Sequence, residues 1–208
     1  MEIIADLSYP ILPGMPTFPG DGEARLVRDR EYERDGYRLT RLDLPAHAGT
    51  HIDLPSHLLA EGRTIIDFSP SCFIAPAVAL DCRGKRTIEL LPEYEKLINS
   101  GDAVIICTDF ADLFGDPMRY YSDYPVLSPD FAEFLARRGV KILGLDTPSP
   151  DKEPYDLHKM LLAAGVFIAE NLVGTSALLE LAPRSYQFMA LPLKLYAEAS
   201  PVRAVAVR

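Results

Sequence analysis

The sequence predicts an α/β fold in which helices cover a mixed sheet, and three observations support this prediction. First, from about residue 74 a helix, a glycine and a short strand follow one another three times. Second, these strands are nearly continuous apolar runs, which is typical of strands that are buried on both faces. Third, no linker or low-complexity tract divides the 208 residues, so one domain spanning residues 1–208 is the simplest organisation.

The N-terminal part of the chain is predicted to be rich in β-structure. Apolar or partly alternating runs indicate strands at residues 3–7, 24–32 and 37–44. Residues 10–21, between the first two of these strands, are dense in proline and glycine. This composition predicts a stiff loop.

The three helices are recognised by the residues at their ends. Pro92 and Pro129 suit the first turn of a helix, Ser128 suits an N-cap, and Gly101 and Gly139 suit the position just past a helix. The helices are expected over residues 92–100, 128–139 and 155–164, and the strands that follow them over residues 103–108, 141–145 and 166–168.

Polar residues stand where these strands end, at Thr108-Asp109, Asp146-Thr147 and Glu170-Asn171. Strand ends of this kind are where α/β folds place ligands. Residues 183–208 are predicted to form a closing hairpin with a structural role, and we assign no chemistry to them.

Composition excludes several classes of partner. The net charge of −9, with no basic run, argues against binding to nucleic acid. An acidic N-terminus and the lack of a long apolar run predict neither a signal peptide nor membrane insertion, so a cytoplasmic protein is expected. Cys72, Cys82 and Cys107 lack C-x-x-C spacing and are expected to be reduced core residues.

Three of the four histidines lie in the stretch His47-Ala-Gly-Thr-His51-Ile-Asp53-Leu-Pro-Ser-His57. Gly49, Thr50 and Pro55 make this stretch a poor helix, so a strand that breaks into a loop is expected. In an extended chain, residues of equal parity point to the same side. The three imidazoles and the Asp53 carboxylate would then share one face.

Two imidazoles and a carboxylate are a common ligand set for a divalent metal, and three protein ligands leave a position for water or substrate. We therefore interpret the stretch as a catalytic metal site. The alternatives are ordinary polar residues in strands and loops, or a closed site with four protein ligands in a protein that binds a ligand or only stabilises its fold. His158 and Glu170, twelve residues apart, could return to the same site, or could each be surface residues.

The motif His47-x-Gly49-Thr50-His51-x-Asp53-x-Pro55-x-His57 closely resembles the signature of the cyclase-like family of metal-dependent hydrolases, which includes bacterial kynurenine formamidase and isatin hydrolase. The resemblance extends to other stretches along nearly the whole chain: Thr17-Phe18-Pro19-Gly20-Asp21, Gly144-Leu-Asp146-Thr147-Pro148-Ser149, Glu170-Asn171-Leu172 and Ala190-Leu-Pro192-Leu.

The resemblance implies a role for each matching position. His47, His51 and Asp53 match metal ligands, and His158 and Glu170 match the ligands that complete a two-metal site. His57 matches a general acid and base. Phe18 stands where the formamidase has a tryptophan that lines the substrate pocket, and this chain has no tryptophan.

The resemblance also implies a swivelling β/β/α-type fold, a homodimer or homotetramer, and one or two Zn²⁺ or Mn²⁺ ions per site. The expected function is hydrolysis of an amide or lactam of a small molecule by metal-activated water, with His57 as general acid and base. A lactone or ester hydrolase is the alternative within the family. A serine hydrolase is disfavoured because no Gly-x-Ser-x-Gly occurs.

Overall fold

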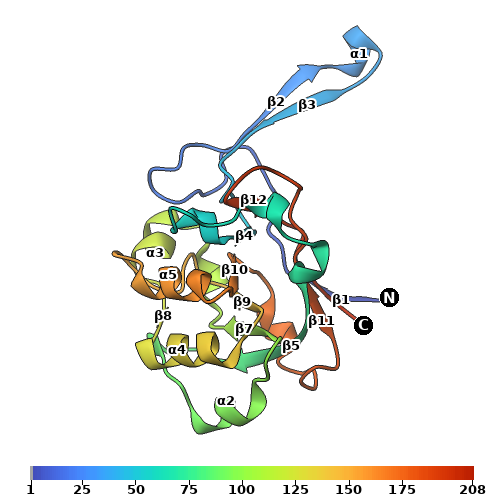
Figure 1. The fold of residues 1–208 in the computed structure, drawn as a ribbon. Coiled ribbons are helices and arrows are strands. Elements are labelled where there is room, and N and C mark those ends of the chain that lie inside the picture. The colour runs from blue at the N-terminus through green and yellow to red at the C-terminus, as the bar shows by residue number, and fades with distance from the viewer. Residues whose placement is uncertain (1) are drawn as a thin grey trace.

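The computed structural model describes residues 2–208, so Met1, the first residue of the predicted domain, lies outside the described residues. The main feature is a nine-stranded mixed sheet, which Figure 1 shows winding from the paired terminal strands to β4 and β12. In their order across the sheet, the strands are β1 (Ile3–Asp6), β13 (Val205–Val207), β11 (Gln187–Met189), β5 (Ile74–Asp81), β7 (Ala103–Cys107), β9 (Ile142–Leu145), β10 (Phe167–Glu170), β4 (His51–Asp53) and β12 (Ala199–Pro201).

The four central strands β5, β7, β9 and β10 run parallel to one another, and the strands on both sides of them pair antiparallel. This arrangement confirms the predicted mixed sheet. Every residue of β7, β9 and β10 is buried, as their apolar sequences predict. Because parallel strands end at the same edge, their predicted polar ends meet there. The Thr108 hydroxyl donates a hydrogen bond to Asp146 at 2.5 Å, and the backbone N–H of Asn171 donates one to the carbonyl of Thr147.

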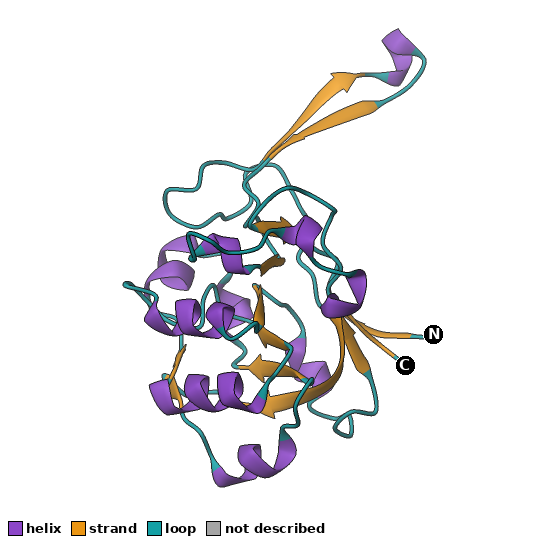
Figure 2. Ribbon diagram, in the orientation of Figure 1, coloured by secondary structure: helices purple, strands orange, loops and turns teal. Residues whose placement is uncertain are grey.

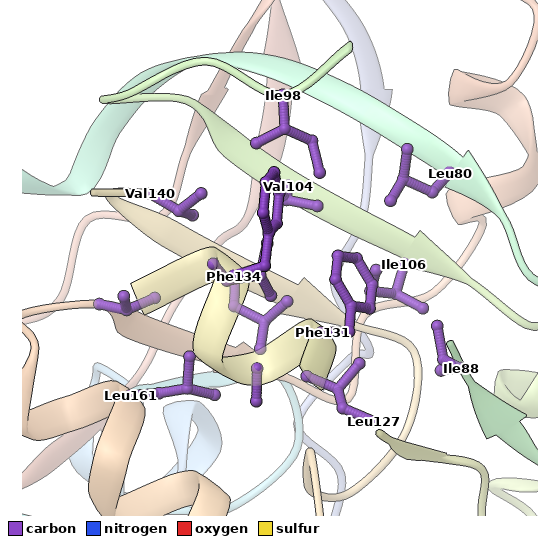
Figure 3. Close-up of a cluster of buried hydrophobic side chains, with 14 of the residues drawn as sticks. Leu80, Ile88, Ile98, Val104, Ile106, Leu127, Phe131, Phe134, Val140 and Leu161 are labelled. Atoms are coloured by element: carbon purple, nitrogen blue, oxygen red, sulfur yellow. The ribbon is translucent and has the colours of Figure 1, made fainter. Parts of the chain in front are cut away.

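Three helices pack on one face of the sheet: α2 (Pro92–Leu97), α4 (Pro129–Arg138) and α5 (Asp156–Ala163). The predicted end signals of α4 are confirmed. The Ser128 hydroxyl accepts a hydrogen bond from the amide of Phe131, and Gly139 adopts the left-handed conformation at φ 70°. Figure 3 shows Phe131 and Phe134 on α4 directed toward β7 and β5.

A second apolar core lies on the opposite face of the sheet. Alternation along β7 divides its side chains between the two cores, so that Val104 and Ile106 face the helices while Ala103 and Ile105 face the other side. Three short 3-10 turns contribute residues to this second core (Figure 2): η2 (Ile65–Asp67), η3 (Pro70–Phe73) and η5 (Thr175–Leu178). The two other 3-10 turns lie elsewhere: η1 (Pro55–His57) contacts α5, and η4 (Phe110–Leu113) packs against a small third core that includes Phe114 and Tyr120.

A two-stranded hairpin projects from the body of the molecule, and we call it the arm (Figure 1). It consists of β2 (Arg25–Arg30) and β3 (Leu39–Asp43), which pair only with each other, and of α1 (Tyr32–Asp35) at the tip. The predicted strands at 24–32 and 37–44 are confirmed, but the sequence does not indicate that they leave the main sheet. None of residues 25–43 is buried.

The remaining elements are the parallel pair β6 (Thr87–Ile88) and β8 (Val126–Leu127), and the short helix α3 (Pro117–Ser122). The predicted C-terminal hairpin exists as β11 paired with β13. The segment that connects these two strands forms β12, which pairs with β4 at the opposite edge of the sheet. None of the helices within residues 2–208 is long and apolar enough to cross a membrane.

Candidate metal centre

Five segments, three of them consecutive in the chain, bring the predicted site residues to one place. β4 carries His51 and Asp53, and it pairs with β10 so that His51 lies directly opposite Glu170. Residues directly opposite each other in an antiparallel pair point to the same face, so their side chains meet. The loop before β4, the turn η1 after it and the first turn of α5 supply the other three side chains, namely His47, His57 and His158.

The backbone around β4 explains why all three histidines of the motif reach this site. Only residues 51–53 are a strand, so the parity argument holds for His51 and Asp53 but not for the whole stretch. Gly49 turns the chain before the strand at φ 63°, and Pro55 begins the 3-10 turn that carries His57. The predicted break from strand into loop is present. His47, however, reaches the site because the chain turns at Gly49, and not because residues 47–51 are extended as the sequence argument assumed.

The Asp53 carboxylate lies at the centre of the cluster and is fully buried. Its Oδ1 atom is 2.9 Å from Nδ1 of His47 and 3.4 Å from Nε2 of His51, and its Oδ2 atom is 3.3 Å from Nε2 of His158. One carboxylate therefore contacts three imidazoles from three different elements.

Glu170 closes the cluster on its other side. Its Oε2 atom lies 3.3 Å from Nε2 of His51, and its Oε1 atom lies 3.9 Å from Nδ1 of His158. The hydroxyl of Ser149 is 3.4 Å from the same Nδ1 atom. His51 and His158 thus each lie between two carboxylates.

Most of these polar atoms are buried without a hydrogen-bond partner among the described residues. They are Nε2 of His51, both oxygens of Asp53, Nε2 of His158 and Oε1 of Glu170. Buried polar atoms without partners are costly, and a shared cation removes that cost. Potential ligand atoms of His51, Asp53 and Glu170 lie within 4.8 Å of one another, as do those of His47, Asp53 and His57. The residues present therefore fit a divalent metal.

Charge and burial act in opposite directions on this cluster. Burial opposes ionisation of Asp53, but the neighbouring imidazoles of His51 and His47 outweigh it and hold the pKa of Asp53 well below its usual value. Burial and the charge of Asp53 raise the pKa of Glu170. Burial alone would lower the pKa of His51 and His158, but the two carboxylates raise both. The carboxylates therefore favour the protonated form of these two imidazoles.

His57 differs from the other histidines. Its ring centre is 4.3 Å from that of His47 and 5.4 Å from that of His158. Burial, together with the charges of the neighbouring imidazoles, outweighs the attraction of Asp53 and lowers the pKa of His57 to about 4. His57 is therefore neutral at pH 7, and its position beside the cluster is compatible with a proton-transfer role and with a ligand role.

A pocket with a volume of about 690 Å³ opens onto the cluster. Phe18 lines it, and its ring centre is 5.4 Å from that of Tyr121 in an edge-to-face arrangement. The other lining residues include Asp21, Ser56, Thr64, Ser149, Tyr155, Tyr196 and Glu198. Tyr120 and Tyr124, which the sequence alone does not place, are buried in the protein interior instead.

Sequence reasoning missed the part of the pocket formed by the C-terminal region. Residues 183–208 were assigned no chemistry, but Tyr196 and Glu198 line the pocket, and Oε1 of Glu198 is 3.6 Å from Nε2 of His47. β12 brings these residues there by pairing with β4. No local pattern in the sequence signals that pairing, because it joins segments about 150 residues apart.

Comparisons with known proteins identify the family of this chain. The family described as "Putative cyclase" matches residues 5–152. Kynurenine formamidase from Bacillus thuringiensis (strain Al Hakam) is 32% identical over 214 residues, covering 96% of this chain and 95% of that protein.

Solved structures share the fold. Isatin hydrolase A from Ralstonia solanacearum has a TM-score of 0.84 at 23% identity, with 97% of this chain and 90% of that chain covered. A potential metal-dependent hydrolase with cyclase activity has a TM-score of 0.77 at 26% identity, covering 98% and 97% of the two chains. The chain therefore belongs to the cyclase family.

Proposed function

We propose that the protein is a metal-dependent hydrolase that cleaves a C–N bond in a formamide-like amide or a lactam of a small molecule. The observation that carries this proposal is the group of buried, unpartnered imidazole and carboxylate atoms that faces one pocket. The sequence relationship to kynurenine formamidase supports the choice of an amide bond.

His47, His51 and Asp53 would hold one metal ion, and Glu170 with His158 would complete a second position that shares Asp53. A divalent ion supplies Lewis acidity: it lowers the pKa of a water molecule to about 7 and polarises the substrate carbonyl. The mixed nitrogen and oxygen ligand set suits both Zn²⁺ and Mn²⁺. Asp53 and Glu170 together carry two negative charges, which balance one divalent ion.

His57 would transfer the proton. Because its imidazole is neutral at pH 7 and lies beside the cluster, it can accept a proton from water and deliver it to the nitrogen that leaves the cleaved bond. Phe18 and Tyr121 provide apolar ring surfaces in the pocket wall, and they would bind the aromatic part of a substrate.

The proposal is tested by elemental analysis of protein purified without added metal, followed by assays with an aryl formamide, a lactam and a lactone. We expect bound metal, hydrolysis of the amides, loss of activity on chelation and recovery with Zn²⁺ or Mn²⁺. Activity that survives complete metal removal would refute the mechanism. Faster hydrolysis of the lactone than of either amide would favour the lactone or ester hydrolase. Tight metal binding without hydrolysis or anion inhibition would indicate a closed binding site.

We also infer that the protein forms a homodimer through the arm. An isolated two-stranded hairpin is marginally stable in water, and this one exposes Tyr32, Tyr37, Leu39 and Leu42. The body of the molecule carries a second exposed apolar segment with Leu191, Leu193, Leu195 and Tyr196. In a two-fold dimer each surface can cover the other.

The charges of the arm favour a second copy of this chain as its partner. Residues 25–43 contain six arginines and five acidic residues, so the arm is slightly positive, whereas the whole chain has a net charge of −9. A slightly basic arm is attracted to the acidic body of another copy.

A further inference from the structure

Asn171 follows directly after Glu170 and is buried, with 3% of its surface exposed. Its backbone has a left-handed conformation with φ 55°, which is unusual for a residue other than glycine. The backbone N–H of Asn171 donates a hydrogen bond to the carbonyl of Thr147, and the backbone carbonyl of Asn171 accepts one from the Thr50 hydroxyl at 2.6 Å. The backbone at Asn171 thus connects the ends of β9 and β10 to the segment before His51.

The side chain of Asn171 makes two further hydrogen bonds inside the protein. Its Oδ1 atom accepts a bond from the Tyr120 hydroxyl at 2.8 Å, and its Nδ2 atom donates one to the carbonyl of Gly49 at 2.9 Å. Tyr120 is itself fully buried on α3. The side-chain amide of Asn171, which directly follows β10, is therefore hydrogen-bonded both to α3 and to the turn at Gly49. These segments are distant in sequence.

The Gly49 carbonyl is also the partner of His51. Nδ1 of His51 lies 2.8 Å from this carbonyl oxygen, which requires that Nδ1 carry a hydrogen and donate it. Nε2 is then the atom directed at Asp53 and Glu170. Because Asn171 and His51 donate to the same carbonyl oxygen, the position of that carbonyl, and with it the orientation of the imidazole, depends on Asn171.

We propose that Asn171, supported by the Tyr120 hydroxyl, is a positioning residue that orients His51 and Glu170 for metal binding. This inference rests on the proposed function, since it assumes a metal ligated by His51. Hydrogen bonds that hold the ligands of a metal typically contribute 10- to 100-fold to its affinity. Asn171 acts at both ligands, through the imidazole of His51 and through the backbone next to Glu170.

The test is metal affinity, measured on metal-free protein by competition with a chelator. Asn171→Gly removes the side-chain amide while keeping a residue that adopts positive φ without strain. We expect affinity for Zn²⁺ to fall about 10- to 100-fold. Tyr120→Phe removes one hydroxyl and keeps the packing of the ring, and the loss should be about three- to tenfold.

Asp109→Gly is the matched control, because Asp109 also has positive φ, at 60°, but its side chain is exposed and does not contact the cluster. Its metal affinity should stay within about twofold of the wild type. Wild-type affinity in both Asn171→Gly and Tyr120→Phe, while the wild-type protein binds metal tightly, would overturn the inference and leave the proposed function standing. A wild-type protein that binds no metal would overturn both. If Asn171→Gly does not fold, Tyr120→Phe alone decides.

Discussion

At the scale of single residues, the site depends on the contrast between Asp53 and His57. Asp53 contacts three imidazoles and has no exposed surface, so its charge must be balanced within the cluster. His57 lies at the edge of the same cluster and is neutral at pH 7. The first residue is suited to holding a cation, and the second is suited to moving a proton.

Replacing His57 tests this division of roles. We expect His57→Ala to retain its metal, because the other imidazoles and both carboxylates remain, but to lose about 10²- to 10⁴-fold in turnover. Metal content by elemental analysis and kcat on an aryl formamide measure the two effects. Ser71→Ala, a change at an exposed residue outside the pocket, serves as the control. Loss of metal from His57→Ala would show that His57 is a ligand.

The apparent metal affinity is predicted to increase with pH. The carboxylates raise the pKa of His51 and of His158, so in the metal-free protein these imidazoles bind protons more tightly than an exposed histidine does. A metal that binds must displace these protons. For each proton displaced, the apparent metal affinity rises by about tenfold per pH unit, up to the pH at which the imidazole of the metal-free protein loses its proton. Chelator competition between pH 6 and pH 8 measures the slope. An affinity independent of pH would contradict this charge state of the cluster.

At the scale of elements, the pairing of β4 with β10 builds the metal centre, because it sets His51 opposite Glu170. The parallel strands next to β10 hold it in place, so that it can pair with β4. β9 lies next to β10 and carries Gly144, where an added Cβ would be 2.6 Å from Cδ1 of Ile105 and 2.9 Å from Cδ1 of Leu172. An alanine at this position would therefore force the ends of these two buried side chains to move, although the backbone conformation of Gly144 does not itself call for glycine.

Gly144→Ala should destabilise the protein by about 1–3 kcal/mol, since the buried neighbours must shift to admit a methyl group. Urea unfolding, monitored by circular dichroism, gives the change in the free energy of unfolding. Gly115→Ala is the matched control, because no heavy atom would lie within 4 Å of its added Cβ. Equal stability of the two variants would show that the space around Gly144 adapts without cost.

The arm should control the oligomeric state. We expect the wild-type protein to be a dimer and Leu39→Glu to be largely monomeric, because the substitution places a charge on an apolar docking surface. Sedimentation velocity measures the masses. Met118→Glu makes the same kind of change at an exposed residue outside the arm and should remain dimeric. A wild-type monomer, or a dimeric Leu39→Glu variant, would refute the role of the arm.

At the scale of the whole molecule, one sheet connects the beginning and the end of the chain, since β1 pairs with β13. The single domain predicted for residues 1–208 should therefore unfold in one cooperative step. A metal present at about 100 times its dissociation constant should add about 2.7 kcal/mol to the free energy of unfolding and raise the melting temperature. Calorimetry with and without Zn²⁺ tests both expectations. Two separate transitions would argue against one domain, and an unchanged melting temperature would argue against the metal site.

Much of this architecture could be predicted because it depends on residues close together in the sequence. Proline marks the start of α2 and α4, serine and glycine mark the two ends of α4, and continuous apolar runs mark β7 and β9. The predicted end of α2 at Gly101 is wrong, because the helix already ends at Leu97. The spacing of His47, His51, Asp53 and His57 is by itself enough to indicate a metal site. These signals are local because capping and backbone conformation involve residues only a few positions apart.

Tertiary structure alone decided which distant segments meet. Pairing of β4 with β10 and β12 brings Glu170 and Glu198 to the histidines, and the buried amide of Asn171 reaches Gly49 across more than a hundred residues. The residues of the arm likewise do not indicate that it lies apart from the main sheet, because the same sequence would form strands inside the main sheet or outside it. The order of the strands and the contacts between distant side chains depend on how the whole chain packs. No short stretch of the sequence determines that packing.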